Sequence, residues 1–135
     1  MHRQLAMLFL ATTALPALSA PVLWDVSAGG NGHYYDFVQA SVDWDTALAG
    51  AVAASHLGQN GYLATVTSAA EQAFIFTAVS SQLAWIGGSD RETEGVWKWI
   101  DGPEAGQIFF GPGAPSSAYS NWGAAEPNNC CSGEN

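Results

Sequence analysis

Regular secondary-structure patterns stop near residue 100, about 35 residues before the last residue of the sequence. From Asp101 onward the chain consists largely of Gly, Pro, Ser and Asn, with scattered aromatic residues. An irregular segment of this length is unusual inside a compact domain, where it is either disordered or a functional loop region. The aromatic residues favour an ordered loop, because disordered segments contain few of them. We therefore expect a small framework that carries a long ordered loop. These aromatic residues are Phe109, Phe110, Tyr119 and Trp122.

Two segments before this loop carry the apolar spacing of helices. The first covers residues 43–56 and can be capped by Ser41 or Asp43. The second begins at Ser68, where Ser-Ala-Ala-Glu forms a capping-box pattern that ends at Glu71. The apolar residues at helical spacing are Trp44, Ala47, Leu48, Ala51 and Val52 in the first helix, and Phe74, Ile75, Ala78 and Val79 in the second.

Short β-prone segments separated by Gly-rich turns surround these helices. The second helix is followed by two such segments, with Gly87-Gly88 expected to close the first of them. The pattern predicts an α+β fold in a single domain, without internal repeats or a linker between domains. The predicted strands cover residues 22–24, 33–38, 62–66, 83–86 and 96–100.

The first twenty residues have the pattern of a cleaved secretory signal peptide. His2 and Arg3 form a basic start, an apolar run covers residues 5–15, and small residues end at Ala20. The alternative is a membrane anchor, but the apolar run is roughly half the ~20 residues that a spanning helix needs. We expect a signal at 1–20, one domain at 21–135, no membrane span in the mature chain, and a secreted, periplasmic or cell-surface location.

The chain is acidic, with twelve Asp and Glu against three Lys and Arg and a formal net charge of −9. No basic stripe is present to neutralise phosphates, which argues against a nucleic-acid partner. The balance is compatible with binding cations, although many acidic proteins owe their charge to solubility alone.

The two cysteines of the chain, Cys130 and Cys131, are neighbours. Export implies an oxidising compartment, yet no spaced pair exists to cross-link the fold. The two thiols can form a strained vicinal disulfide, pair with partners elsewhere, or stay free. A zinc site needs more Cys and His at ligand spacing than this sequence offers, and His33 and His56 are isolated.

Five motifs follow one another in a family-like order: YLATV at 62–66, WIGG at 85–88, WKW at 97–99, NW at 121–122 and EPN at 126–128. Their order and spacing resemble the C-type lectin-like domain over roughly residues 33–135. The resemblance implies two helices that flank small antiparallel sheets, and a long loop that binds calcium and carbohydrate.

In this family the EPN tripeptide resembles the mannose-type signature, in which the proline bond is cis. The resemblance implies that Glu126, Asn128 and Glu134 supply oxygens to a primary calcium ion, a hard cation that collects six to eight of them. The same three residues would bind two neighbouring sugar hydroxyls, since a carboxylate accepts and an amide donates. Mannose, fucose, glucose and N-acetylglucosamine carry suitable hydroxyls. The alternative is a plain loop tripeptide.

The segment 90–95 resembles the part of the family that supplies a second, auxiliary calcium ion. Asp90 and Glu94 match its two carboxylate positions, Asn129 is a weaker match, and Glu134 would be shared between the ions. The alternative is a solvated acidic turn. A cation would relieve the repulsion among these acids.

The sequence departs from the family in two ways. It ends at Asn135, before the strands and the Trp-Asn-Asp motif that complete the calcium shell, so we expect a fragment with the last strands missing and with impaired calcium and sugar binding. The long-range disulfides of the family are also absent, so packing must stabilise the fold. We expect four tryptophans to belong to the core: Trp44, Trp85, Trp97 and Trp122.

Three classes of function compete. The leading one is a secreted, calcium-dependent lectin domain, and the second is a protein-binding or adhesive module of the same fold. The third is a hydrolase with Glu126 and Glu134 as a carboxylate pair. Both residues lie on a Gly- and Asn-rich loop without the apolar surroundings that would raise a carboxyl pKa, and no Ser-His-Asp arrangement stands out. We therefore predict that the protein is not an enzyme.

Overall fold

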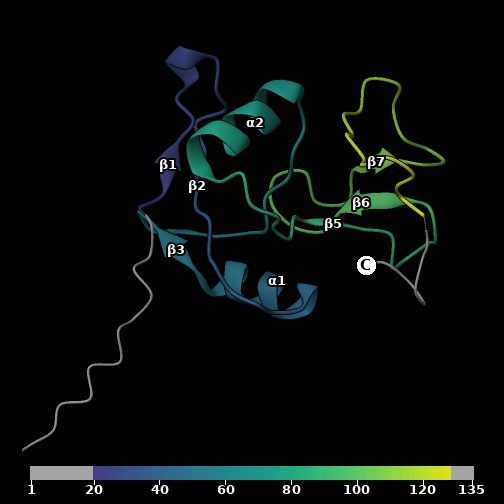
Figure 1. Ribbon diagram of the computed structural model, residues 1–135, viewed down its shortest axis with the longest axis horizontal. Coiled ribbons are helices and arrows are strands. Elements are labelled where there is room, and N and C mark those ends of the chain that lie inside the picture. The colour runs from purple at the N-terminus through teal and green to yellow at the C-terminus, as the bar shows by residue number, and fades with distance from the viewer. Residues whose placement is uncertain (1–19, 129–135) are drawn as a thin grey trace, which may run out of the picture.

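The computed structural model describes residues 20–128. Two helices lie on either side of a middle layer of extended chain, and three small antiparallel sheets complete the α+β fold (Figure 1). Strands β1 and β2 pair with each other, β3 pairs with β4, and the third sheet has the order β5-β6-β7. The elements are β1 (Val22–Leu23), η1 (Val26–Ala28), β2 (Tyr34–Tyr35), α1 (Trp44–Ala53), β3 (Ser55–His56), β4 (Gln59–Asn60), α2 (Ala69–Phe74), η2 (Ile75–Val79), β5 (Gly88–Ser89), β6 (Trp97–Trp99) and β7 (Ile108–Phe110).

Helix α1 begins where the sequence predicts and ends earlier. Asp43 is the N-cap, and its carboxylate accepts a hydrogen bond of 2.8 Å from the Thr46 N–H. The helix ends at Ala53 instead of continuing to residue 56, because residues 55–56 pair with residues 59–60 in a hairpin. Leu57 and Gly58 form the tip of that hairpin with positive φ angles of 49° and 79°, which are incompatible with a continuing helix.

Helix α2 is anchored at its first turn by a buried carboxylate. Ser68 is the N-cap, and its hydroxyl accepts from the Glu71 N–H at 3.1 Å. The Glu71 carboxylate does not return to Ser68 as in a capping box. It accepts instead from the N–H and the hydroxyl of Thr67, at 2.7 and 2.9 Å. Its other oxygen accepts from the Tyr35 hydroxyl at 2.5 Å. Glu71 is only 2% exposed, so this network fixes α2 against β2 in the interior.

The predicted strands at 62–66 and 83–86 are wrong. The first segment is irregular chain that receives a backbone hydrogen bond from Gly87 to the Ala64 carbonyl, at 2.9 Å. The strand of the WIGG region, β5, starts at Gly88, although the glycine pair was expected to end a strand. A Cβ on Gly87 would lie 2.8 Å from the Leu63 carbonyl oxygen, so glycine allows two backbones to approach closely here.

The core forms where the aromatic residues of the long loop fold back onto β6. Trp99 stacks on Phe109 with ring centroids 4.0 Å apart, and Trp97 meets Trp122 edge-on at 4.8 Å. The expected order of the loop is therefore confirmed for its described part. Because side chains alternate along a strand, Trp97 and Trp99 are both buried, while Lys98 between them is less so.

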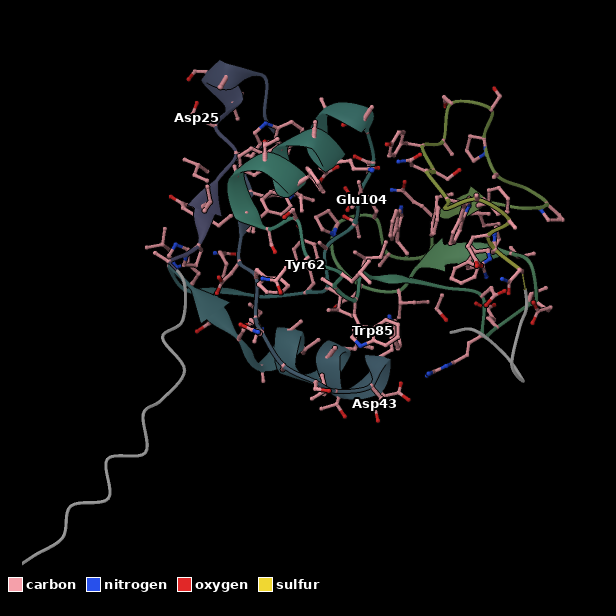
Figure 2. All side chains as sticks on the ribbon, in the orientation of Figure 1. Asp25, Asp43, Tyr62, Trp85 and Glu104 are labelled. Atoms are coloured by element: carbon pink, nitrogen blue, oxygen red, sulfur yellow. The ribbon has the colours of Figure 1, made fainter. Side chains whose placement is uncertain are left out.

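The prediction of four core tryptophans is confirmed in part. Trp44 and Trp97 are buried, and Trp122 is partly buried against the core. Trp85 is 49% exposed, so its assignment to the core is wrong. It lies beside α1 (Figure 2), and its indole N–H donates to the Val42 carbonyl at 2.8 Å. Trp99, only 4% exposed, is the core tryptophan that the prediction missed.

Tyr62 lies between the two helices, near Glu104 (Figure 2). Its hydroxyl and the His33 Nδ1 are 2.9 Å apart. Burial, followed by the negative charge of Glu104, raises the pKa of Tyr62 to about 12. Within residues 20–128, no helix has the length and apolar character needed to cross a bilayer.

Candidate functional site

The Glu126–Asn128 turn holds an acid and an amide in direct contact. The Glu126–Pro127 bond is cis, as the family resemblance implies. The Asn128 side-chain amide donates to Glu126 Oε1 at 2.7 Å, and the Asn128 backbone N–H donates to Oε2 at 3.2 Å. Both side chains belong to exposed residues. The turn therefore presents a carboxylate and an amide together at the surface.

The acidic turn 90–95 follows β5 directly and is held by its own hydrogen bonds. Asp90 is 5% exposed, and its Oδ2 accepts from the Gly95 N–H at 3.0 Å. The Asp90 carbonyl accepts from the Thr93 N–H, also at 3.0 Å. Glu94 projects from the same turn as an exposed residue. Asp90 is thus fixed by the fold, while Glu94 stays accessible to a ligand.

These two turns, far apart in the sequence, meet around one cavity of about 290 Å³. Asp90 and Glu94 contribute from one side, and Pro127 and Asn128 from the other. Glu126 is linked to the cavity by the two hydrogen bonds from Asn128. The remaining lining residues are Gly95, Trp97 and Phe110. Asn129, Glu134, Cys130 and Cys131 fall outside the described residues.

The lysine and arginine side chains in the described part of the chain form ion pairs with acids that do not line this cavity. Arg91 pairs with Asp45 at 2.6 Å and lies 5.0 Å from the ring centre of Trp44. Lys98 pairs with Glu92 at 2.7 Å. Neither pair includes Asp90, Glu94 or Glu126. The acidic groups at the cavity are therefore not neutralised by lysine or arginine within residues 20–128.

The donor set at the cavity fits a hard cation in its chemistry. Two carboxylates and one amide offer the oxygens that calcium prefers. No group of three or more His, Cys, Asp or Glu residues that could hold a metal occurs within the described residues. The described ligands are therefore fewer than the six to eight oxygens that calcium collects. Residues 20–128 alone therefore do not offer a complete coordination shell for such an ion.

The sequence profile of the Lectin C-type domain matches residues 47–134, which is more than half of the chain. The chain belongs to the C-type lectin family. Its fold, with two helices and small antiparallel sheets, is consistent with that family. Members of this family are binding domains and not enzymes, which supports the prediction made from the sequence.

Curated relatives of this C-type lectin domain come from archaea and vertebrates. It is 48% identical to halomucin of Haloquadratum walsbyi over 99 residues, which are 73% of the chain and 1% of halomucin. It is 35% identical to C-type lectin domain family 4 member F of Mus musculus, over 73% of the chain and 16% of that protein. Hepatic lectin of Gallus gallus is 28% identical, over 73% of the chain and 40% of that protein. The lectin domain therefore spans less than half the length of each of these relatives. No solved structure matches the chain.

Two residues that line the cavity of this lectin domain were not predicted from the sequence to belong to the site. Trp97 was assigned only to the core, and Phe110 only to the ordered loop, yet both form walls of the cavity. The indole N–H groups of Trp97 and Trp122 are buried without a hydrogen-bond partner in the described structure. The WKW motif could have indicated the first wall, because it follows the acidic turn directly.

Proposed function

We propose that this domain binds neutral sugars of the mannose type with the help of calcium. The observation that carries the proposal is the meeting of Asp90, Glu94 and Asn128 around one cavity, directly beside Glu126. Oxygen ligands of acid and amide type gather there without a neutralising base from the described chain. Homology to carbohydrate-binding lectins supports the same conclusion.

The proposed primary calcium ligands are Glu126, Asn128 and Glu134, and the same residues bind the sugar. Calcium, when bound, would offer coordination positions to two neighbouring sugar hydroxyls. The Glu126 carboxylate would accept from a hydroxyl, and the Asn128 amide would donate to one. In the structure these two groups satisfy each other at 2.7 Å. Binding therefore exchanges an exposed internal hydrogen bond for contacts with the ligand, which costs little because the net value of such a bond is about 1 kcal/mol.

The proposed auxiliary ligands are Asp90, Glu94 and Asn129. Asp90 uses Oδ2 for the Gly95 N–H, which leaves Oδ1 for a cation. Because Asn128 lines the same cavity as Asp90 and Glu94, a cation held by the acidic turn would also stabilise the EPN turn. A positive charge there would reduce the repulsion among the acids.

We further propose that residues 1–20 direct export and that residues 21–135 form the lectin domain. Sugar binding at one such site is expected to be weak, so several copies acting together would be needed for firm attachment to a glycan.

A second candidate function, protein binding through the same fold, is favoured by a different surface. Four large apolar residues in or near the WIGG motif are exposed, with exposed fractions between 41% and 102%. Exposed apolar groups of this size are typical of contact surfaces when they are contiguous. They are Leu83, Trp85, Ile86 and Ile100.

The test is calorimetric titration of the whole gene product with calcium, followed by methyl α-mannoside. We expect calcium binding first, sugar binding only in its presence, and weaker binding of the galactoside, in which the hydroxyls at C2 and C4 have the opposite orientation. Glu126→Gln should abolish sugar binding, and Asp90→Asn should weaken calcium binding. Glu92→Gln is the matched control, since Glu92 is an exposed acid that pairs with Lys98.

Two results would decide against the proposal. If the whole gene product takes up no calcium, the acidic turns do not form a cation site. If calcium binds but no sugar follows, the site stabilises a loop and the protein-binding function takes precedence.

A further inference from the structure

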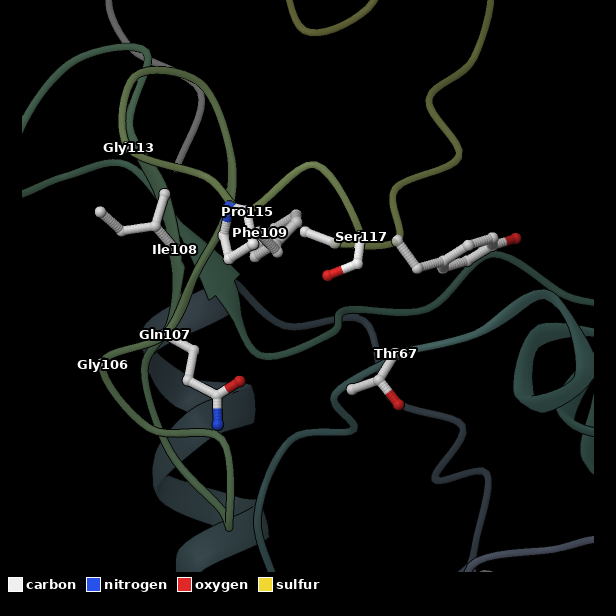
Figure 3. A pocket seen from close by; sticks show the side chains of 10 residues that line it. Thr67, Gly106, Gln107, Ile108, Phe109, Gly113, Pro115 and Ser117 are labelled. Atoms are coloured by element: carbon white, nitrogen blue, oxygen red, sulfur yellow. The ribbon is translucent and has the colours of Figure 1, made fainter.

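A second cavity, of about 470 Å³, lies beside β7, where Ile108 and Phe109 form part of its wall (Figure 3). Its walls are the turn before β7, the first two residues of β7, the loop 111–119, and Thr67 just before α2. Adjacent residues of β7 line different cavities, since Phe109 lines this one and Phe110 lines the one at the acidic turn. Its volume falls within the range of about 300–1,000 Å³ that is typical of small-molecule sites.

The walls of this cavity are fixed by hydrogen bonds. The Tyr119 hydroxyl donates to the Gln72 side chain at 2.6 Å, which fastens the loop to α2. The Ala118 N–H donates to the Pro115 carbonyl at 2.9 Å and closes a turn within the loop. The Gln107 N–H donates to the Glu104 carbonyl, also at 2.9 Å. The cavity is therefore preformed, which lowers the entropic cost of binding a ligand.

The polar groups that face this cavity are neutral. The Gln107 amide and the Ser117 hydroxyl extend into the space in Figure 3, and neither side chain has a hydrogen-bond partner among the described residues. The Thr67 hydroxyl donates to Glu71, which leaves its oxygen free to accept. Among residues 20–128, no Asp, Glu, Lys, Arg or His lines the cavity. Ile108, Phe109 and Pro115 supply apolar wall surface.

We infer that this cavity is a second saccharide subsite, which binds a neutral sugar ring without calcium. Gln107 and Ser117 each offer both a donor and an acceptor, as a molecule with many hydroxyls requires. The apolar residues suit the C–H face of a pyranose ring. A net charge of −9 and the lack of a basic lining residue disfavour anions, and the lack of an acidic lining residue disfavours cations. The subsite goes beyond the calcium-dependent function and does not depend on it.

The experiment is saturation-transfer-difference NMR on the whole gene product in EDTA, with mannose, galactose, N-acetylglucosamine and maltose as probes at millimolar concentration. We expect at least one probe to receive saturation in EDTA and to lose it in the double variant Gln107→Ala/Ser117→Ala. Both residues are exposed, so the double variant should fold normally. Ser116→Ala is the matched control, because Ser116 is an exposed neighbour that does not line the cavity.

Glu126→Gln separates the two sites. It should leave the signal in EDTA unchanged while it removes the calcium-dependent binding of the mannoside. The inference is overturned if none of the four probes receives saturation in EDTA, or if the signal survives in Gln107→Ala/Ser117→Ala. A signal that disappears in Glu126→Gln would also overturn it, because the sugar would then occupy the EPN turn.

Discussion

The buried carboxylate of Glu71 offers the sharpest test of how this domain is stabilised. Four donors converge on it: the Tyr35 hydroxyl, the Asn31 amide, and the N–H and hydroxyl of Thr67. In the substitution Glu71→Gln, the amide has one oxygen and one NH₂ in place of two oxygens. Its oxygen must stay with the Thr67 N–H, because a backbone donor cannot reverse its role. The NH₂ then faces Tyr35 and Asn31, which are donors themselves.

The least costly response is for the Tyr35 hydroxyl to accept from the new amide. That hydroxyl already accepts from Asn31 at 2.7 Å, so its own hydrogen loses the Glu71 oxygen and stays unpaired in the interior. A buried donor without a partner costs about 1–3 kcal/mol, and the hydrogen bonds to Thr67 also lose their charge assistance. We expect a loss of about 2–3 kcal/mol. For a domain of this size the melting temperature should fall by roughly 10 °C.

Urea denaturation of the single and double variants measures this loss and its origin. Tyr35→Phe removes the hydroxyl that becomes unpaired, so Tyr35→Phe/Glu71→Gln should be less destabilised than the sum of the two single variants, by more than about 1 kcal/mol. Glu92→Gln is the control, since its exposed ion pair should contribute less than about 1 kcal/mol. The reasoning is refuted if Glu71→Gln changes the unfolding free energy by less than about 0.5 kcal/mol, or if the two substitutions are additive.

Three further predictions concern the turns, the caps and the response to alkaline pH. A Cβ on Gly111 would lie 1.9 Å from the Gly95 carbonyl oxygen, so Gly111→Ala should destabilise the domain by more than Gly58→Ala, which has a similar positive φ but open space around it; urea midpoints compare the two. Ser68→Ala removes the N-cap of α2 and should cost about 1 kcal/mol in the same assay. The folded-state pKa of Tyr62, about 12, lies above its ordinary value of 10.0, so its contribution to stability is complete below pH 10 and is lost as the pH rises toward 12. Unfolding measured across that interval should show a weaker pH dependence in Tyr62→Phe, and an unchanged dependence would contradict the assignment.

The starts of the helices could be predicted from the sequence because caps are local. Asp43 and Ser68 each lie within four residues of the N–H group that they satisfy. The end of α1 could not be predicted, because it depends on the pairing of residues 55–56 with residues 59–60 across a tight turn. Apolar spacing alone favoured a longer helix, and hairpin formation overrode it.

The strands show the opposite balance, because their pairing depends on distant segments. Glycines at 87 and 88 look like the end of a strand, yet a Cβ on Gly88 would lie 2.9 Å from the ring of Phe109, a residue of the loop. Only the folded loop reveals that this close approach requires glycine. Strand β7 escaped prediction for the same reason: it is three residues long and pairs with β6 through an irregular register. The alternation of Trp97 and Trp99 was visible, but which face is covered depends on that pairing.

The site itself combines both limits. The acidic turn at 90–95 and the EPN turn could be identified separately, and only the resemblance to a family joined them, since thirty residues separate them. Their proximity around one cavity is a property of the fold. The structure adds a fact about charge that no motif contains: Arg91 and Lys98 pair with Asp45 and Glu92. Within the described residues, neither lysine nor arginine therefore neutralises the acids at the cavity. A bound cation, as in the proposed function, would reduce the repulsion among these acids, and this is why calcium uptake is the observation on which the proposed function depends.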